Sequence, residues 1–197
     1  MGDSPTTRVS LLLRLRDARD GEAWAEFVDL YAPLVYRLAR RHGLQDADAA
    51  DLTQEVLTAL HSSLPRFRYD ASRGSFRGWL FTVARNFLRR SAHDRRRHPP
   101  ASGDSDAHAL LEQQPAPPEE VERWEQEYQQ RLFEYAAQRV RAHFRPATWE
   151  AFWRTSIEGQ NARDVAEALH LSVGAVYIAR TRVLARIREQ IRLLEGE

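Results

Sequence analysis

Apolar side chains recur at the spacing of an α-helix along most of the chain, and the longest break in this pattern lies at residues 98–118. In residues 22–42, for example, Trp24, Phe27 and Tyr31 fall on one helical face. No stretch alternates apolar and polar residues between turn signals, as a half-buried strand would. The sequence therefore predicts an all-α fold.

Capping residues and helix breakers set the expected helix limits. The expected helices are residues 10–17, 22–42, 46–62, 75–92, 119–144, one that starts at Pro146, 161–169 and 172–194. The expected caps and breakers are Pro33 as a kink, Gly43 as a stop, and Asp46 or Asp48, Ser75, Asn161 and Ser172 as N-caps. Residues 98–118 hold five prolines among Ser, Gly, Asp and Gln, a composition typical of an extended linker. We therefore expect two small helical domains, residues 1–97 and 119–197, joined by a linker at residues 98–118.

Composition excludes several classes of protein. The chain has no cysteine, which rules out disulfides and thiolate metal sites. No apolar run approaches the roughly 18–20 residues that span a bilayer, so no membrane insertion is expected. The N-terminal residues lack the pattern of a signal peptide, and we expect a cytoplasmic protein. His170 has no partners at metal-ligand spacing, and we expect neither a metal nor a cofactor.

Charge is distributed unevenly along a chain whose net charge is only +1. Residues 73–97 carry eight arginines against one acid, and residues 173–192 carry five arginines against one acid. Residues 104–127 carry eight acids and one arginine, and residues 17–55 are also net acidic. Two basic segments separated by acidic ones are typical of two surfaces that face nucleic acid, although solvated helix faces show the same composition.

Residues 159–177 have the pattern of a helix-turn-helix. Asn161 caps a short first helix, His170 and Leu171 form the turn, and Ser172 caps a basic second helix. In this motif the second helix enters the major groove of DNA with its N-terminal residues near base edges. The residues expected to contact DNA are Ser172, Gly174, Ala175, Tyr177, Ile178, Arg180, Thr181, Arg182 and Arg186. An ordinary helical hairpin with a basic last helix is the alternative.

An acidic stripe marks the helix expected at residues 46–62. Asp48, Asp51 and Glu55 are spaced i, i+3 and i+7 and share one helical face, with Gln54 at its border. Paired carboxylates perform acid–base chemistry only in a pocket that perturbs them, and the sequence supplies none. The stripe therefore docks a basic partner or serves only solubility.

Residues 76–90 divide into an apolar face and a polar face. The apolar face, expected in the core, holds Phe76, Trp79, Leu80, Val83 and Phe87. The polar face holds Gly78, Thr82, Arg85, Asn86 and Arg89, and Arg90 extends it. Asparagine reads base edges, and arginine binds phosphate or guanine. The preceding loop, residues 66–73, has the aromatic and polar residues that hold an unstacked base.

Four stretches resemble the extracytoplasmic-function (ECF) sigma factors of the sigma-70 family. Asp51-Leu-Thr-Gln54-Glu55 resembles the region 2.2 signature Asp-Leu-x-Gln-Glu. Residues 76–86 resemble regions 2.3 and 2.4, residues 67–73 match the position that captures a flipped −10 base, and residues 171–176 resemble the region 4.2 recognition helix. The stretches follow the family's order, with no insertion large enough for the region 3 domain of housekeeping sigma factors.

The resemblance implies a promoter-recognition subunit of bacterial RNA polymerase that is not an enzyme. It assigns core polymerase binding to Asp48, Asp51, Gln54 and Glu55. It assigns reading and melting of the −10 element to Phe67, Tyr69, Arg73, Arg77, Arg85, Asn86, Arg89 and Arg90. It assigns recognition of the −35 element to residues 119–197. The chain departs from the family where Tyr177 and Ala179 replace basic residues and Arg180 replaces a leucine.

The implied partners are the β′ clamp helices and the β flap of core RNA polymerase, promoter DNA, and an anti-sigma factor of the kind that commonly holds ECF members. The main alternative is a helix-turn-helix regulator that binds duplex DNA without polymerase. This alternative assigns no function to the acidic stripe. A helical sequestering adaptor leaves the arginine clusters unexplained. An enzyme is the weakest alternative, because the sequence has no phosphate-binding glycine loop and no nucleophile–base pair.

Overall fold

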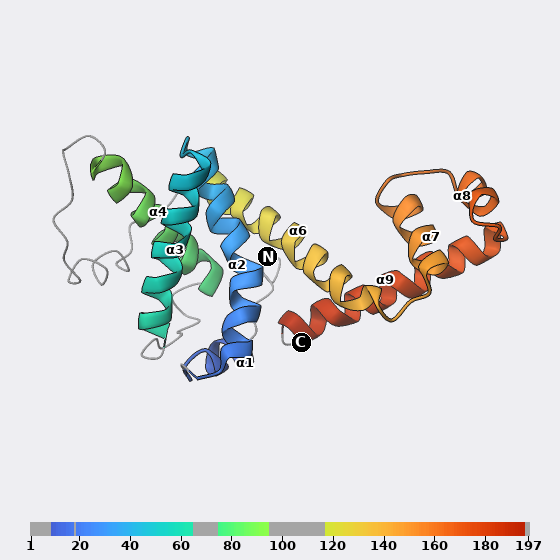
Figure 1. The fold of residues 1–197 in the computed structure, drawn as a ribbon, viewed down its shortest axis with the longest axis horizontal. Coiled ribbons are helices and arrows are strands. Elements are labelled where there is room, and N and C mark those ends of the chain that lie inside the picture. Colours follow the sequence, from blue (N-terminus) through green and yellow to red (C-terminus); the bar gives the residue numbers. More distant parts are fainter. Residues whose placement is uncertain (1–8, 18, 65–74, 95–116, 196–197) are drawn as a thin grey trace. The chain divides into compact units, whose positions relative to one another are not determined.

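A computed structural model describes residues 9–17, 19–64, 75–94 and 117–195 (Figure 1). These residues form helices and no strand, so the predicted all-α fold is confirmed. The helices are α1 (Val9–Arg14), α2 (Gly21–Arg41), α3 (Asp46–Ser63), α4 (Phe76–Asp94), α6 (Pro118–Arg141), α7 (Pro146–Ser156), α8 (Ala162–Ala168) and α9 (Val173–Glu195). No helix in the described ranges combines the length and apolarity needed to cross a membrane.

The chain folds into two compact units, and the boundary between them falls inside α6. The first unit extends to Arg131, and the second runs from Leu132 to Glu195. The first part of α6 therefore belongs to the unit built from α1 to α4. The sequence predicts that the second domain begins at residue 119, and most of the predicted linker, residues 98–116, lies outside the described residues.

Gly43 ends α2, as predicted. Its φ of 83° lies in the left-handed region that glycine adopts without steric cost. The amide of Gly43 donates to the Arg40 carbonyl (3.0 Å), and the amide of Leu44 donates to the Ala39 carbonyl (3.2 Å). These two bonds form a Schellman motif, which satisfies carbonyls that the helix end would leave without donors. Pro33 lies within α2, which continues through it to Arg41.

The expected acidic cap of α3 is wrong. The N-cap is Gln45, which makes no side-chain capping bond, and Asp46 and Asp48 lie within the first turn. Asp46 instead accepts a hydrogen bond from the Tyr36 hydroxyl (3.1 Å) and pairs with Arg40 (3.0 Å). The carboxylate that the sequence offers for capping thus ties the start of α3 to the end of α2.

The core of the first unit forms where α2, α3 and α4 pack together, with α2 and α3 side by side in Figure 1. Three buried aromatic rings lie at its centre. The Phe27 ring lies 4.7 Å from that of Tyr31 and 6.1 Å from that of Phe76, while Tyr31 and Phe76 are 6.0 Å apart. Edge-on and tilted ring contacts of this kind are favourable beyond the apolar area they bury. Trp79, expected in the core, is half-buried against Phe76.

The first part of α6 completes this core from outside the predicted domain. Trp124 and Tyr128 are almost fully buried, with 1% and 2% of their surface exposed. The Trp124 ring lies 5.4 Å from Phe81 of α4, and the Tyr128 ring stacks on Tyr31 of α2 at 5.7 Å. Burying two large aromatic side chains contributes several kcal/mol of apolar transfer free energy, so this part of α6 is integral to the first unit.

In the second unit α7 and α8 pack against α9. The cluster of buried residues at this junction consists of Ala151, Val165, Ala166, Val176 and Ala179. Leu169 and Leu171, from the turn between α8 and α9, pack against the cluster. Three of the five buried side chains are alanines, and such small residues let the helices approach closely. This packing holds α8 and α9 in the helix-turn-helix arrangement that the sequence predicts.

Candidate nucleic-acid interface

The predicted acidic stripe lies on the solvent face of α3. Asp48, Asp51, Gln54 and Glu55 are all exposed. The opposite face of the helix is buried through Ala49, Leu52, Thr53, Val56 and Leu60. The Thr53 hydroxyl donates to the Ala49 carbonyl (2.7 Å), which satisfies the polar residue on the buried side. Packing against α2 and α4 therefore presents the carboxylates together on one open face.

Helix α4 begins with a side-chain cap, as predicted. The amide of Gly78 donates to the Ser75 hydroxyl oxygen at 3.1 Å. The predicted apolar face is confirmed for Phe76, Leu80, Val83 and Phe87, all of which are buried. The cap and this face fix the orientation of the helix, and hence the side of the molecule on which its arginines lie.

A second face of α4 is also buried, which sequence analysis missed. It consists of Arg77, Phe81, Ala84 and Leu88, at i, i+4, i+7 and i+11. Phe81 on this face contacts Trp124 of α6. The apolar spacing of Phe81, Ala84 and Leu88 was visible in the sequence. Arg77 disguised it, because an arginine suggests an exposed face.

Arg77 is the clearest departure from the predicted site. Its side chain is 0% exposed, and its guanidinium forms two hydrogen bonds with the Glu125 carboxylate, at 2.7 and 3.0 Å. It also lies 4.3 Å from the centre of the Tyr128 ring. Burial, the largest single effect, lowers the pKa of Arg77, but the Glu125 carboxylate together with Tyr128 and Tyr31 more than offsets it, so the pKa of Arg77 is raised. A buried arginine held in this way cannot reach DNA, so its place in the predicted −10 set is corrected to a structural one.

The remaining predicted −10 residues of α4 differ in exposure. Arg85 is 13% exposed and pairs with Glu120 of α6 at 3.2 Å. Asn86 and Arg90 are half-buried, and Arg89 is exposed. The structure therefore brings Arg85, Asn86, Arg89 and Arg90 onto one helix with some surface each. Phe67, Tyr69 and Arg73 lie outside the described residues.

An ion pair and a side-chain-to-backbone contact also join the first part of α6 to α2. Arg41 pairs with Glu127, and the Arg131 guanidinium donates to the Asp29 carbonyl oxygen at 2.9 and 3.0 Å. Glu120, Glu125 and Glu127 all lie in the acidic segment that the sequence assigned in part to the linker and in part to the second domain. Their partners show that these acids bind arginines of the first unit.

The helix-turn-helix is capped at both helix starts, as predicted. The Asn161 side chain accepts from the Arg163 amide (2.8 Å), and the Ser172 hydroxyl accepts from the Ala175 amide (3.1 Å). His170 holds the turn with a φ of 54°, a left-handed conformation that is uncommon for a residue other than glycine. Turn and caps together fix where α9 begins.

Nearly all of the predicted −35 contacts are accessible on α9. Ser172, Gly174, Tyr177, Ile178, Arg180, Thr181, Arg182 and Arg186 are exposed, and Ala175 is half-buried. Tyr177 and Ile178 are among the most exposed large apolar side chains described, at 55% and 61%. Arg186 pairs with Glu189 at 2.7 Å along the helix surface. Val176, Ala179 and Val183 face inward, as the sequence predicts.

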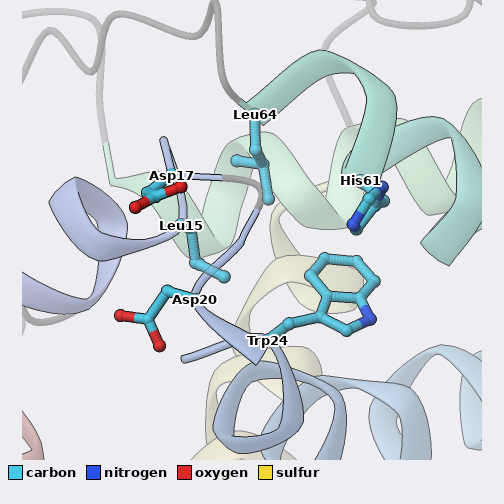
Figure 2. Close-up of a pocket in the computed structure, with 6 residues that line it drawn as sticks. All are labelled: Leu15, Asp17, Asp20, Trp24, His61 and Leu64. Atoms are coloured by element: carbon cyan, nitrogen blue, oxygen red, sulfur yellow. The ribbon is translucent and has the colours of Figure 1, made fainter. Parts of the chain in front are cut away.

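The first unit has a small hollow among its described residues. It lies between the turn that joins α1 to α2, the start of α2 and the end of α3, and is lined by Leu15, Asp17, Asp20, Trp24, His61 and Leu64 (Figure 2). It has room for about one water molecule, and the Trp24 ring lies edge-on to His61 at 4.8 Å. Among the described residues, no group of three or more His, Asp or Glu side chains is placed to hold a metal ion.

Part of the chain matches a known protein family. Residues 27–98 match the sigma-70 region 2 family. The chain is 35% identical over 81 residues to the ECF RNA polymerase sigma factor RpoE of Cereibacter sphaeroides, covering 41% of this chain and 44% of that protein. It is 36% identical over 66 residues to the ECF RNA polymerase sigma factor SigE of Mycolicibacterium smegmatis, covering 34% and 24%. Each match spans less than half of the relative. Residues 27–98 thus match sigma-70 region 2, and the chain is similar to ECF members of the sigma-70 family.

Proposed function

We propose that this protein binds core RNA polymerase and directs transcription initiation at promoters with defined −10 and −35 elements. The observation that carries the proposal is the exposed face of α3 formed by Asp51, Gln54 and Glu55, within the residues that match sigma-70 region 2. A helix that buries one side and presents two carboxylates and an amide on the other is suited to a basic protein partner. The family resemblance identifies this partner as the β′ clamp helices, with Asp48 at the edge of the contact.

The −10 element is read, in this proposal, by α4 and the loop before it. Arg89 and Arg90 bind phosphates, and Asn86 reads a base edge. Phe67, Tyr69 and Arg73 hold a base that has left the stack. Because this loop binds only an unstacked base, its binding free energy favours the melted strand and shifts the promoter toward opening.

Arg85 joins the DNA contact by exchanging partners. Its guanidinium pairs with the Glu120 carboxylate, an anion that a DNA phosphate can replace at the same charged group. Glu120 therefore competes with DNA for a basic group on α4. Arg77 takes no part, because it stays buried against Glu125.

The second unit reads the −35 element through α9. Its N-terminal turns enter the major groove, where Ser172, Gly174 and Ala175 bring the backbone close to the DNA. Arg180, Arg182 and Arg186 bind phosphates on either side, which makes the affinity salt-dependent. The same unit contacts the β flap of polymerase. The protein acts in the cytoplasm without covalent chemistry, and an anti-sigma factor is a further expected partner.

Binding to core polymerase tests this proposal on the purified full-length chain. The Asp51→Ala/Gln54→Ala/Glu55→Ala variant removes two carboxylates and one amide from the exposed face of α3. The control Glu119→Ala/Glu122→Ala/Gln126→Ala removes the same groups from exposed positions on α6. Fluorescence anisotropy of labelled protein titrated with core polymerase measures the affinity.

We expect the α3 variant to bind core polymerase at least about tenfold more weakly than the wild type, as loss of several charge-assisted contacts predicts. The α6 control keeps the wild-type affinity. Failure of the wild-type chain to bind core polymerase would contradict the proposal. Equal weakening by both variants would show that net charge, not the α3 face, sets the affinity.

A further inference from the structure

The outward direction of α9 is fixed by its buried side. Val176, Ala179, Val183 and Ile187 are buried, at 0–6% exposure. At about 100° of rotation per residue, the direction opposite to them is occupied by Gly174, Ile178, Thr181 and Ala185, with Tyr177 beside Ile178. All five are exposed. This set, here named the outward stripe, carries no charged side chain.

The outward stripe presents apolar groups at its surface. Ile178 is 61% exposed and Tyr177 55% exposed, both within the first two turns of the capped helix. Thr181 donates its hydroxyl to the Tyr177 carbonyl oxygen at 3.0 Å. Because this bond uses the only proton of the hydroxyl, Thr181 has no hydrogen-bond donor left for a partner and offers its methyl group and an acceptor oxygen. Single exposed apolar residues are ordinary, but between residues 174 and 185 they share one line that carries no charged or amide side chain.

Between residues 174 and 186, arginines flank the outward stripe without entering it, and Arg188 and Arg192 continue its line toward the end of α9. By the same rotation, Arg182 and Arg186 lie to one side and Arg180 to the other. All three are exposed, and residues 173–192 carry five arginines against one acid. A basic margin around an uncharged centre complements the major groove, in which phosphates border the base edges.

The stripe lacks the groups that read guanine or adenine by paired hydrogen bonds. Arginine or lysine pairs with guanine, and asparagine or glutamine pairs with adenine, whereas the thymine C5-methyl group is read by apolar contact. We propose that α9 reads the −35 element chiefly through thymine methyl groups, with Ile178, Tyr177 and the Thr181 methyl group as the specificity-determining contacts. This inference rests on the proposed function of α9 at the −35 element.

Replacing thymine by deoxyuridine tests the inference, because it removes the methyl group and keeps the base pair. Holoenzyme, assembled from the full-length chain and core polymerase, selects duplexes from a pool randomised in the −35 region. Each thymine of the selected −35 element is then replaced by deoxyuridine in turn, and the affinity is measured. The variants are Ile178→Ala and, as a control, Leu193→Ala, an exposed apolar residue near the other end of α9.

We expect the selected element to contain thymines whose replacement weakens binding about fourfold each, the value of one buried methyl group. Ile178→Ala removes that sensitivity for at least one thymine, and Leu193→Ala keeps it. This pairing of a protein change with a DNA change isolates the contact itself.

Two other outcomes separate this inference from the function on which it rests. If deoxyuridine has no effect while Arg180→Ala/Arg182→Ala weakens binding, α9 contacts DNA by other means and the inference is overturned alone. If neither the deoxyuridine nor the arginine changes alter affinity for the −35 region, α9 is not the reading helix. In that case the proposed −35 function falls together with the inference.

Discussion

At the scale of single residues, Arg77 and Arg85 show that two arginines on one helix can have different roles. They lie about two turns apart on α4, and each pairs with a glutamate of α6. Arg77 is fully buried and holds Glu125 through two hydrogen bonds, while Arg85 keeps 13% of its surface exposed. Burial thus separates a residue that stabilises the domain from one that can exchange a carboxylate for a phosphate.

Replacing Arg77 should unfold the first unit more easily. In Arg77→Ala, Glu125 loses its partner and a large buried side chain is removed beside Tyr128. We expect the free energy of unfolding to fall by about 2 kcal/mol, below the range for fully buried pairs because Glu125 is about a third exposed. Denaturant unfolding followed by circular dichroism measures it. Arg123→Ala, at an exposed position on α6, should change it by less than about 0.5 kcal/mol; equal losses would contradict the assigned role.

Removing the charge of Glu120 should strengthen binding to DNA. In Glu120→Gln, Arg85 no longer has a carboxylate competing with phosphate for its guanidinium. We expect holoenzyme affinity for promoter DNA to rise about two- to fivefold, the value of a partly exposed ion pair. Glu119→Gln, at an exposed position in the same first turn of α6, serves as the control. An equal gain in both variants would point to general charge repulsion instead.

The start of α2 supplies a pH-dependent contact. Hydrogen bonds from the Arg14 guanidinium (2.7 and 2.9 Å), and then from the Ala23 amide (2.9 Å), lower the pKa of Asp20 below its ordinary value of 3.8. A carboxyl with a lowered folded-state pKa stabilises the protein above the unfolded value and loses that contribution as pH falls through the folded one.

Asp20→Asn removes this charge while it keeps an oxygen that can cap α2. We expect the variant to have a lower Tm than the wild type at neutral pH. The difference stays constant down to about pH 4 and disappears below it. Thermal unfolding across this range measures it, with Glu22→Gln, whose side chain is 96% exposed, as the control. A difference that persists unchanged well below pH 4 would show that the charge is not responsible.

At the scale of helices, the turn between α8 and α9 carries local strain. His170 sits at φ 54°, where a non-glycine residue costs about 1–2 kcal/mol relative to an ordinary helix conformation. Its amide donates to the Glu167 carbonyl (3.2 Å), and the Leu171 amide donates to the Ala166 carbonyl (2.8 Å), as in the Schellman motif at Gly43. The same hydrogen-bond pattern therefore ends both α2 and α8. The left-handed residue is Gly43 after α2 and His170 after α8.

His170→Gly should stabilise the second unit. Glycine adopts the left-handed conformation without steric cost, although it loses more freedom on folding, and we expect a net gain of about 0.5–1 kcal/mol. Thermal unfolding measures this gain. Ala185→Gly, at an exposed position inside α9, should instead destabilise the unit by about 1 kcal/mol. Destabilisation by both changes would show that the turn is not strained.

Local signals predicted the helix ends better than they predicted the helix surfaces. The caps at Ser75, Asn161 and Ser172 and the stop at Gly43 follow from a few neighbouring residues, and all four are confirmed. The expected acidic cap of α3 failed, because the Asp46 carboxylate binds Tyr36 and Arg40 of another helix instead. A capping pattern compares residues within about one helical turn, so it does not detect a hydrogen bond between Tyr36 and Asp46, which lie ten residues apart.

The helix that covers the second buried face of α4 was beyond prediction for a related reason. Phe81 and Arg77 are covered by Trp124, Glu125 and Tyr128, which are more than 40 residues away in the sequence. No periodicity within α4 tells which other helix will cover a face. The exposed stripe on α3 was predictable because the sequence of this one helix contains both the apolar residues of its buried face and the acidic residues of its exposed face.

At the scale of the whole molecule, the division into two units does not coincide with the change in composition. The acidic, proline-rich segment suggests a boundary near residue 118, whereas the first unit extends to Arg131. The first part of α6 therefore belongs to the same unit as α3 and α4. In our account this unit contains the polymerase-binding face, the −10 helix and the acids that pair with its arginines.

Run-off transcription with purified core RNA polymerase and a promoter library tests the central claim most directly. The wild type, the Asp51→Ala/Gln54→Ala/Glu55→Ala variant and the Glu119→Ala/Glu122→Ala/Gln126→Ala control are compared at equal concentration. Our account predicts that the wild type and the control start transcripts downstream of one defined −35/−10 pair, and that the α3 variant does not. A wild-type chain that shifts duplex DNA alone but never starts a transcript with core polymerase would contradict it.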